Sequence, residues 1–87
     1  MRVRIYLDKY SDVQNFCNAL NIKALPYKTE LVSGDGRYRV NAKSFLGCLL
    51  AHTEWGGDIW FESDEDLYST VEEWINIENG DGNFIHE

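Results

Sequence analysis

The chain has 87 residues, of which 44% are hydrophobic and 14% aromatic, and a net charge of −7, a combination that indicates one small globular domain. No stretch approaches the ~20 consecutive apolar residues that cross a membrane. The first residues, Met1 to Arg4, lead into an alternating pattern without an apolar signal core, so we expect a cytoplasmic protein. Cys17 and Cys48 lack close spacing, and we expect both to be reduced core residues.

The charge is divided unevenly along the chain. All eight Lys and Arg lie in residues 1–43 beside four acids, whereas residues 44–87 hold eleven acids and no Lys or Arg. This polarity indicates a charged partner surface, charge pairing within the fold, or a solvated acidic helix face. The sequence leaves these three interpretations open.

The first half of the chain predicts a strand, a helix and a hairpin. Residues 2–7 alternate apolar and polar side chains, which is typical of a half-buried strand. Ser11 precedes Gln14 in a capping-box pattern and is expected to begin a helix. The apolar face of this helix is formed by Val13, Phe16, Cys17 and Leu20. Residues 25–32 alternate again, and the turn at 33–36 returns the chain as a hairpin partner over 37–40.

The second half predicts a helix, a strand and a final helix. Residues 44–52 form a short apolar helix, and residues 58–62 form a strand with Ile59 and Phe61 facing inward. Ser63 is expected to cap the last helix, with Asp66 in the reciprocal position. The buried stripe of that helix is Leu67, Val71, Trp74 and Ile75.

The element order β-α-β-β-α-β-α, with one apolar face on each strand, predicts an α+β fold with a four-stranded antiparallel sheet. The three helices are expected on one side of this sheet. We expect residues 1–78 to form the domain. Residues 79–87 are expected to be a flexible C-terminal tail, because Gly and Asn dominate the stretch that begins it.

The segment Val40–Gly47 is the most specific motif, because a strand runs directly into Ser44 at the start of a short apolar helix. This segment resembles the regulatory-serine region of the HPr family, the phosphocarriers of the bacterial sugar phosphotransferase system. The resemblance extends over about residues 2–76 and is supported by Gly57–Phe61 and the acidic last helix. It implies an open-faced β-sandwich fold.

The family's phosphocarrier histidine is missing. In the family, a histidine followed closely by an arginine begins the first helix and carries a phosphoryl group from enzyme I to the sugar-specific enzymes II. The corresponding stretch here, Lys9–Phe16, contains neither residue type. Imidazole nitrogen is the nucleophile of that transfer, and Asp12 is more simply explained by the helix dipole. We therefore expect a protein that is not an enzyme.

The regulatory serine is preserved as Ser44. The resemblance implies that a kinase modifies Ser44, that the modified form binds transcriptional regulators of carbon use, and that the neighbouring side chains dock into protein partners. The docking residues that match are Lys43, Phe45, Leu46 and Leu49. The alternatives are that Ser44 is only a helix cap and that Phe45 and Leu49 fold inward as core. Histidine-less relatives regulate carbon catabolite repression, so we expect a regulatory, protein-binding module whose partner is a regulator, a kinase or a phosphotransferase component.

Two other functions have support in the sequence. An acidic decoy that binds a basic protein would use a run of carboxylates in the C-terminal half, namely Glu62, Asp64, Glu65, Asp66, Glu72, Glu73 and Glu78. The outer sheet face is expected to carry Arg2, Arg4, Tyr6, Lys28, Arg37, Arg39 and Trp60. Such a face resembles a platform for single-stranded nucleic acid, but the net charge of −7 disfavours nucleic acid. Shielding of the sheet is the preferred interpretation.

His52 and His86 suggest no metal site, because their acidic neighbours lack ligand spacing. We expect His52 to lie at a helix end, where a cation suits the dipole. The Glu78–Asn83 stretch lacks the alternating acids of a calcium loop. No cofactor is expected.

Overall fold

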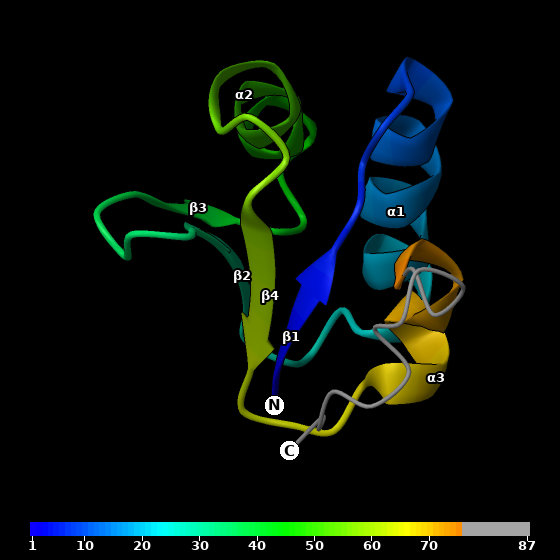
Figure 1. The fold of residues 1–87 in the computed structure, drawn as a ribbon. Coiled ribbons are helices and arrows are strands. Elements are labelled where there is room, and N and C mark those ends of the chain that lie inside the picture. The colour runs from blue at the N-terminus through cyan, green and yellow to red at the C-terminus, as the bar shows by residue number, and fades with distance from the viewer. Residues whose placement is uncertain (76–87) are drawn as a thin grey trace.

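The structure, a computed structural model, describes residues 1–75. Its elements follow the chain in the order β1 (Arg2–Ile5), α1 (Tyr10–Lys23), β2 (Thr29–Ser33), β3 (Arg39–Asn41), α2 (Phe45–Glu54), β4 (Ile59–Ser63), α3 (Tyr68–Val71) and the 3-10 turn η1 (Glu72–Trp74) (Figure 1). The predicted α+β class and element order are therefore confirmed. The tail predicted over 79–87, and the last three residues of the expected domain, lie outside the described residues.

The four strands form one antiparallel sheet in the order β1-β4-β2-β3. Val3, Phe61 and Leu31 lie side by side in the register and are all buried. The adjacent row runs Arg4, Trp60, Val32 and Arg39 and lies on the opposite face, because neighbouring residues of a strand point to opposite sides. One face is therefore apolar, and the other carries the charged side chains together with the Trp60 ring and the buried Val32.

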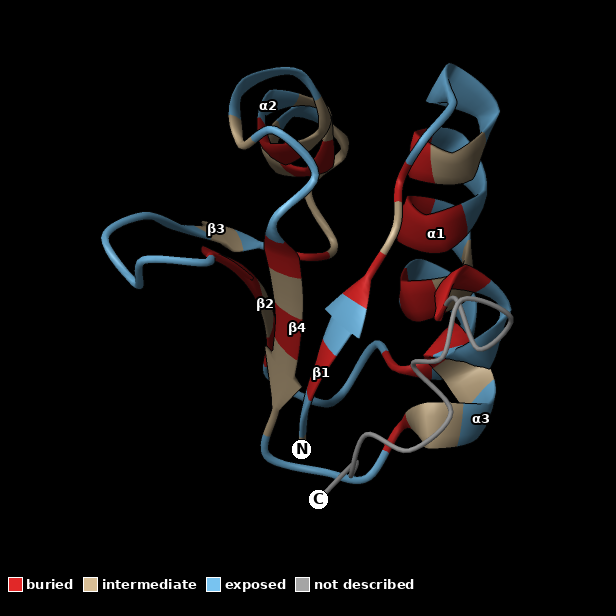
Figure 2. Cartoon of the chain, viewed as in Figure 1, coloured by how far each residue is buried: buried red, intermediate tan, exposed pale blue. Residues whose placement is uncertain are grey.

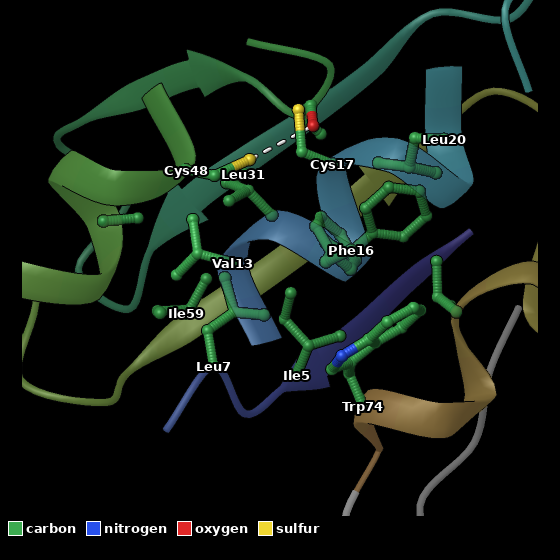
Figure 3. Close-up of a cluster of buried hydrophobic side chains, with 14 of the residues drawn as sticks. Ile5, Leu7, Val13, Phe16, Cys17, Leu20, Leu31, Cys48, Ile59 and Trp74 are labelled. Atoms are coloured by element: carbon green, nitrogen blue, oxygen red, sulfur yellow. Dashed lines mark hydrogen bonds between the residues drawn. The ribbon is translucent and has the colours of Figure 1, made fainter. Parts of the chain in front are cut away.

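The helices pack on the apolar face of the sheet. The stripe predicted for α1 is confirmed, since Val13, Phe16, Cys17 and Leu20 are all buried. The ring of Phe16 makes an edge contact with Phe61 on β4, at 5.9 Å between centroids. It makes a second edge contact with Trp74 on η1, at 5.2 Å (Figure 3). This contact joins α1, the sheet and the last turn into one core, while the strands' other face remains open (Figure 2).

Two predicted helix caps are wrong. The N-cap of α1 is Lys9, not Ser11, and the Lys9 N–H donates to Asp12 Oδ2 at 2.9 Å. The carboxylate of Asp12 thus bonds the free backbone group at the helix start. Ser63 is the last residue of β4 and not a cap, because its N–H bonds the Met1 carbonyl at 3.0 Å and extends the sheet.

The last helix is also shorter than predicted. It begins at Tyr68, whose N–H donates to Asp66 Oδ1 at 3.0 Å, and passes into η1 after four residues. Its buried stripe is nevertheless as expected. The strand predicted over 25–32 begins only at Thr29, because the Tyr27 N–H bonds the Ala24 carbonyl at 3.0 Å and turns the chain after α1.

The open face of the sheet carries paired charges. Arg39 donates to Glu30 Oε1 at 2.9 Å and to Glu62 Oε1 at 3.1 Å, and Arg2 donates to Glu62 Oε2 at 3.1 Å. The Arg2 guanidinium also lies 4.1 Å from the ring centroid of Trp60. Charge pairing within the fold, one of the three interpretations of the uneven charge, is therefore confirmed on this face. None of the helices within residues 1–75 combines the length and apolarity that crossing a bilayer requires.

Candidate functional site

The candidate site is the first turn of α2 and the segment that leads into it. Ser44 has an extended backbone, with φ of −89° and ψ of 119°, and its Oγ accepts a hydrogen bond from the Gly47 N–H at 3.1 Å. The Ser44 carbonyl accepts the Cys48 N–H at 2.9 Å, the first bond of the helix ladder. Ser44 is therefore the N-cap of α2, a role that contributes about 1 kcal/mol.

Gly47 allows α2 to approach β3 closely. A Cβ atom built on Gly47 would lie 3.0 Å from Val40 Cβ and 3.2 Å from the Asn41 carbonyl oxygen. These distances leave no comfortable room for a side chain, because the atoms met belong to the backbone or are bonded directly to it. The close approach fixes the start of α2 against the strand that precedes it, which accounts physically for a glycine in the Val40–Gly47 motif.

Helix α1 holds the chain just before Ser44. The Lys43 carbonyl accepts hydrogen bonds from Asn21 Nδ2 at 3.0 Å and Cys17 Sγ at 3.2 Å. From α2, Cys48 Sγ donates to the Ala42 carbonyl at 3.2 Å, and Figure 3 shows the two cysteines side by side in the core. Burial raises the pKa of both thiols, that of Cys48 to about 12, so they stay protonated donors at neutral pH. Both cysteines are free and buried, as predicted.

The residues predicted to bind a partner divide into two groups. Leu46 is 75% exposed, whereas Phe45 and Leu49 are partly buried against the core. Leu50, one turn after Leu46, is 48% exposed, and the exposed ring of Tyr10 contacts Phe45 edge-on at 5.9 Å. We call Tyr10, Phe45, Leu46, Leu49 and Leu50 the α2 patch. The i, i+4 spacing of the two leucines would have identified Leu50 from the sequence, but the contact of Tyr10 has no signal there.

The Lys43 side chain extends away from the Ser44 hydroxyl. Its ammonium donates to the backbone carbonyl of Tyr27, in the turn before β2. The Ser44 hydroxyl therefore bonds the backbone N–H of Gly47 in α2, and the charge of Lys43 lies on the β2 side of the segment.

The start of α1 has a histidine near it, but this histidine comes from another helix. His52 Nδ1 lies 2.5 Å from the Leu7 carbonyl oxygen, which only accepts, so this nitrogen carries the proton. The bond joins the end of α2 to the segment between β1 and α1, and His52 lies in the last helical turn as predicted. In the part of the chain that the structure describes, no three His, Cys, Asp or Glu side chains gather as a metal site. His86 lies outside that part.

The carboxylates of the possible decoy surface are spread over two segments. The connection from β4 to α3 and the turn η1 expose Asp64, Glu65, Asp66, Glu72 and Glu73. Glu62 instead pairs with two arginines on the open face, and Glu78 lies outside the described residues. In comparisons with known proteins, no family model, curated protein or solved structure matches this chain.

Proposed function

We propose that the protein is a non-catalytic, HPr-like regulatory module that binds a protein partner through the α2 patch. In this proposal, phosphorylation of Ser44 controls binding, and the partner belongs to sugar phosphotransferase or carbon catabolite regulation. The observation that carries the proposal is the position of Ser44 as the N-cap of a helix whose first turn carries Leu46, a side chain that is 75% exposed. A modification at the cap would thus change the surface beside an exposed apolar side chain.

The element order supports the family part of the proposal. The described chain runs β-α-β-β-α-β-α with an open sheet face, the order and openness that the HPr resemblance implies. The segment from Lys9 to Phe16, where the family's phosphocarrier histidine would lie, has no histidine, and Asp12 there is occupied by the Lys9 N–H. A binding role is therefore favoured over phosphoryl transfer.

The electrostatics of the first turn of α2 support phosphorylation. A phosphoserine carries about −1.5 to −2 charges at neutral pH, and the positive end of the helix dipole attracts anions. The first turn of α2 contains no acidic side chain that would repel a phosphate. The backbone N–H of Gly47, which now bonds the hydroxyl, would bond a phosphate oxygen instead. Phosphorylation would therefore leave α2 folded.

The exposed leucines support a partner surface. Leu46 and Leu50 project from successive turns of α2, and the Tyr10 ring from α1 continues the same apolar patch through its contact with Phe45. Large apolar groups gathered on a surface usually mark a site of protein association. Phe45 and Leu49 support this surface from below, since both pack against the core.

The experiment that tests the regulation is the intact mass of the protein from its native host, with fragmentation to locate any phosphate. Phosphate on Ser44 under some carbon sources but not others is the expected result. Unmodified protein under every carbon source would leave Ser44 as a structural cap and contradict the regulatory part of the proposal.

The experiment that tests the surface compares captured partners for matched variants. The double variant Leu46→Ser, Leu50→Ser should no longer capture partners that the natural sequence still captures at high salt. The variant Ile22→Ser should capture them as the natural sequence does. Ile22 is the matched control because it is 79% exposed and lies near the other end of α1. Equal loss in both variants would contradict a role of the α2 patch.

The acidic decoy is a second candidate, favoured by the exposed carboxylates between β4 and η1. Binding through them would weaken steeply with salt, because exposed charges are screened. It would also survive the leucine substitutions. Partner capture that is sensitive to salt and insensitive to the leucine substitutions would identify the acidic surface, and not the α2 patch, as the binding site.

A further inference from the structure

A second candidate site lies at the end of the β2–β3 pair, apart from the α2 patch. It is a pocket of about 490 Å³ whose walls include Tyr27, Lys28, Glu30, Arg39, Asn41 and Lys43. Its volume lies within the roughly 300–1,000 Å³ of small-molecule sites. The walls come from the turn before β2, from both strands and from the segment before Ser44, so residues from several segments converge on it.

The pocket is positively charged in a negatively charged protein. Its walls carry three basic side chains and one carboxylate, whereas the whole chain has a net charge of −7. Arg39 donates hydrogen bonds to both Glu30 and Glu62, and the bond that it donates to Glu62 raises the pKa of Arg39 above its ordinary value. The carboxylate in the pocket is thus already neutralised by an arginine. The charge that remains is that of the two lysines.

Lys28 and Lys43 are the unpaired cations of this pocket. Among residues 1–75, neither ammonium has a carboxylate oxygen within 4.0 Å, in contrast to Arg2, Arg4 and Arg39. Lys43 instead bonds the neutral backbone carbonyl of Tyr27. Two ammonium groups without counter-charges on one concave surface favour an anion that carries two charges.

The backbone at Lys43 is held in place. Its N–H donates to Asn41 Oδ1 at 2.9 Å, and its carbonyl accepts from Asn21 Nδ2 at 3.0 Å and Cys17 Sγ at 3.2 Å. A backbone that is already ordered lowers the entropic cost of binding. On binding, the Lys43 ammonium would exchange its hydrogen bond to the Tyr27 carbonyl for one to a charged acceptor, which is stronger.

We propose that this pocket binds a small molecule that bears a phosphate monoester, with the ammonium groups of Lys28 and Lys43 contacting the phosphate oxygens. Lysine binds phosphate as a point charge. Tyr27, which is 38% exposed, is one of the residues that line the pocket. In this proposal its aromatic ring packs against the rest of the ligand. This proposal does not rest on phosphorylation of Ser44 or on binding through the α2 patch.

The test is an NMR titration of the full chain with inorganic phosphate and with adenosine monophosphate, each compared with sodium chloride at equal ionic strength. We expect saturable shifts of the backbone amides around the pocket. Lys43→Met and Lys28→Met should each weaken binding about tenfold, equivalent to about 1.4 kcal/mol, and Lys43→Arg should retain it. Lys9→Met is the matched control, because Lys9 lies at the far end of α1, a helix of 14 residues that is about 20 Å long.

The two ligands distinguish the sources of the phosphate. Tighter binding of adenosine monophosphate than of phosphate, lost in Tyr27→Leu, identifies a ligand with an aromatic base, and equal binding of both identifies the phosphate group alone. Absence of saturable shifts, or an equal loss of affinity in Lys9→Met, would overturn the proposal. The amide spectrum of each free variant shows that it is folded, and Ser44→Ala should bind phosphate as the natural sequence does.

Discussion

Substitution of Ser44 tests whether the start of α2 tolerates a negative charge. The Ser44 hydroxyl accepts the Gly47 N–H at 3.1 Å. Ser44→Ala removes this acceptor. Ser44→Asp keeps an acceptor and places a negative charge at the positive end of the helix dipole, as a phosphate would. We therefore expect Ser44→Ala to lower the free energy of unfolding and Ser44→Asp not to lower it.

The expected magnitudes follow from the position of the cap. Replacing an N-cap serine by alanine costs about 0.5–2 kcal/mol, and we expect about 1 kcal/mol here because Ser44 and Gly47 are only half-buried. A charge at a helix N-terminus contributes about 0.3–1 kcal/mol at low salt. Ser44→Asp should thus be as stable as the natural sequence or slightly more stable. In a domain of this size, 1 kcal/mol shifts Tm by about 4–8 °C.

The assay is urea unfolding followed by tryptophan fluorescence, with thermal unfolding as a second measurement. The m-value should stay constant, since the surface exposed on unfolding does not change. Ser69→Ala is the matched control because Ser69 is exposed on α3, and it should leave stability nearly unchanged. Equal destabilisation by Ser44→Asp and Ser44→Ala would refute the reasoning, because the helix start would then reject an anion. Full stability of Ser44→Ala would refute the cap itself.

Three further predictions concern the core and the α2 contacts. Gly47→Ala should lower the free energy of unfolding in urea, because the new Cβ would lie 3.0 Å from Val40 Cβ in β3. This is expected although alanine is about 1 kcal/mol more favourable than glycine in a helix. Thr53→Ala, at an exposed position of the same helix, should not lower it. Phe16→Ala should lose about 3–5 kcal/mol, measured by the same method, whereas Ile22→Ala should lose little because Ile22 is 79% exposed. Burial raises the pKa of the Cys48 thiol from 9.0 to about 12. The stability linked to this thiol is therefore complete below pH 9 and is lost as the pH rises toward 12. In Cys48→Ala, the free energy of unfolding should fall less steeply with alkaline pH.

The pattern of apolar side chains predicted the fold well where local rules decide the structure. The α1 stripe from Val13 to Leu20 is a matter of helical spacing, and Ser44 caps α2 because its hydroxyl meets the N–H three residues on. Ser63 also precedes an expected helix and also looks like a cap in the sequence. Its N–H nevertheless donates to the Met1 carbonyl in the sheet. That pairing depends on a contact 62 residues away, which no local pattern reveals.

The candidate sites were predictable only in part for the same reason. Ser44 and Leu46 are visible in the sequence, but the burial of Phe45 depends on how α2 lies against the core. The pocket of Lys28 and Lys43 was not predicted at all. Its charge emerges only because the register across the sheet pairs Arg39 with Glu62, 23 residues away, and leaves the two lysines without carboxylates.

The strand order has a consequence for the kinetics of folding. Strand β1 pairs only with β4. The contact between Arg2 and Glu62, which are 60 positions apart in the chain, can therefore form only after the whole intervening chain is available. Of the strand pairs, only β2 with β3 is local. Contacts of such long sequence separation slow folding, because loop-closure entropy is lost before the contacts form. During synthesis on the ribosome, β1 and the apolar face of α1 would therefore stay uncovered by β4 until that strand has emerged, an interval in which the nascent chain is exposed to aggregation and proteolysis.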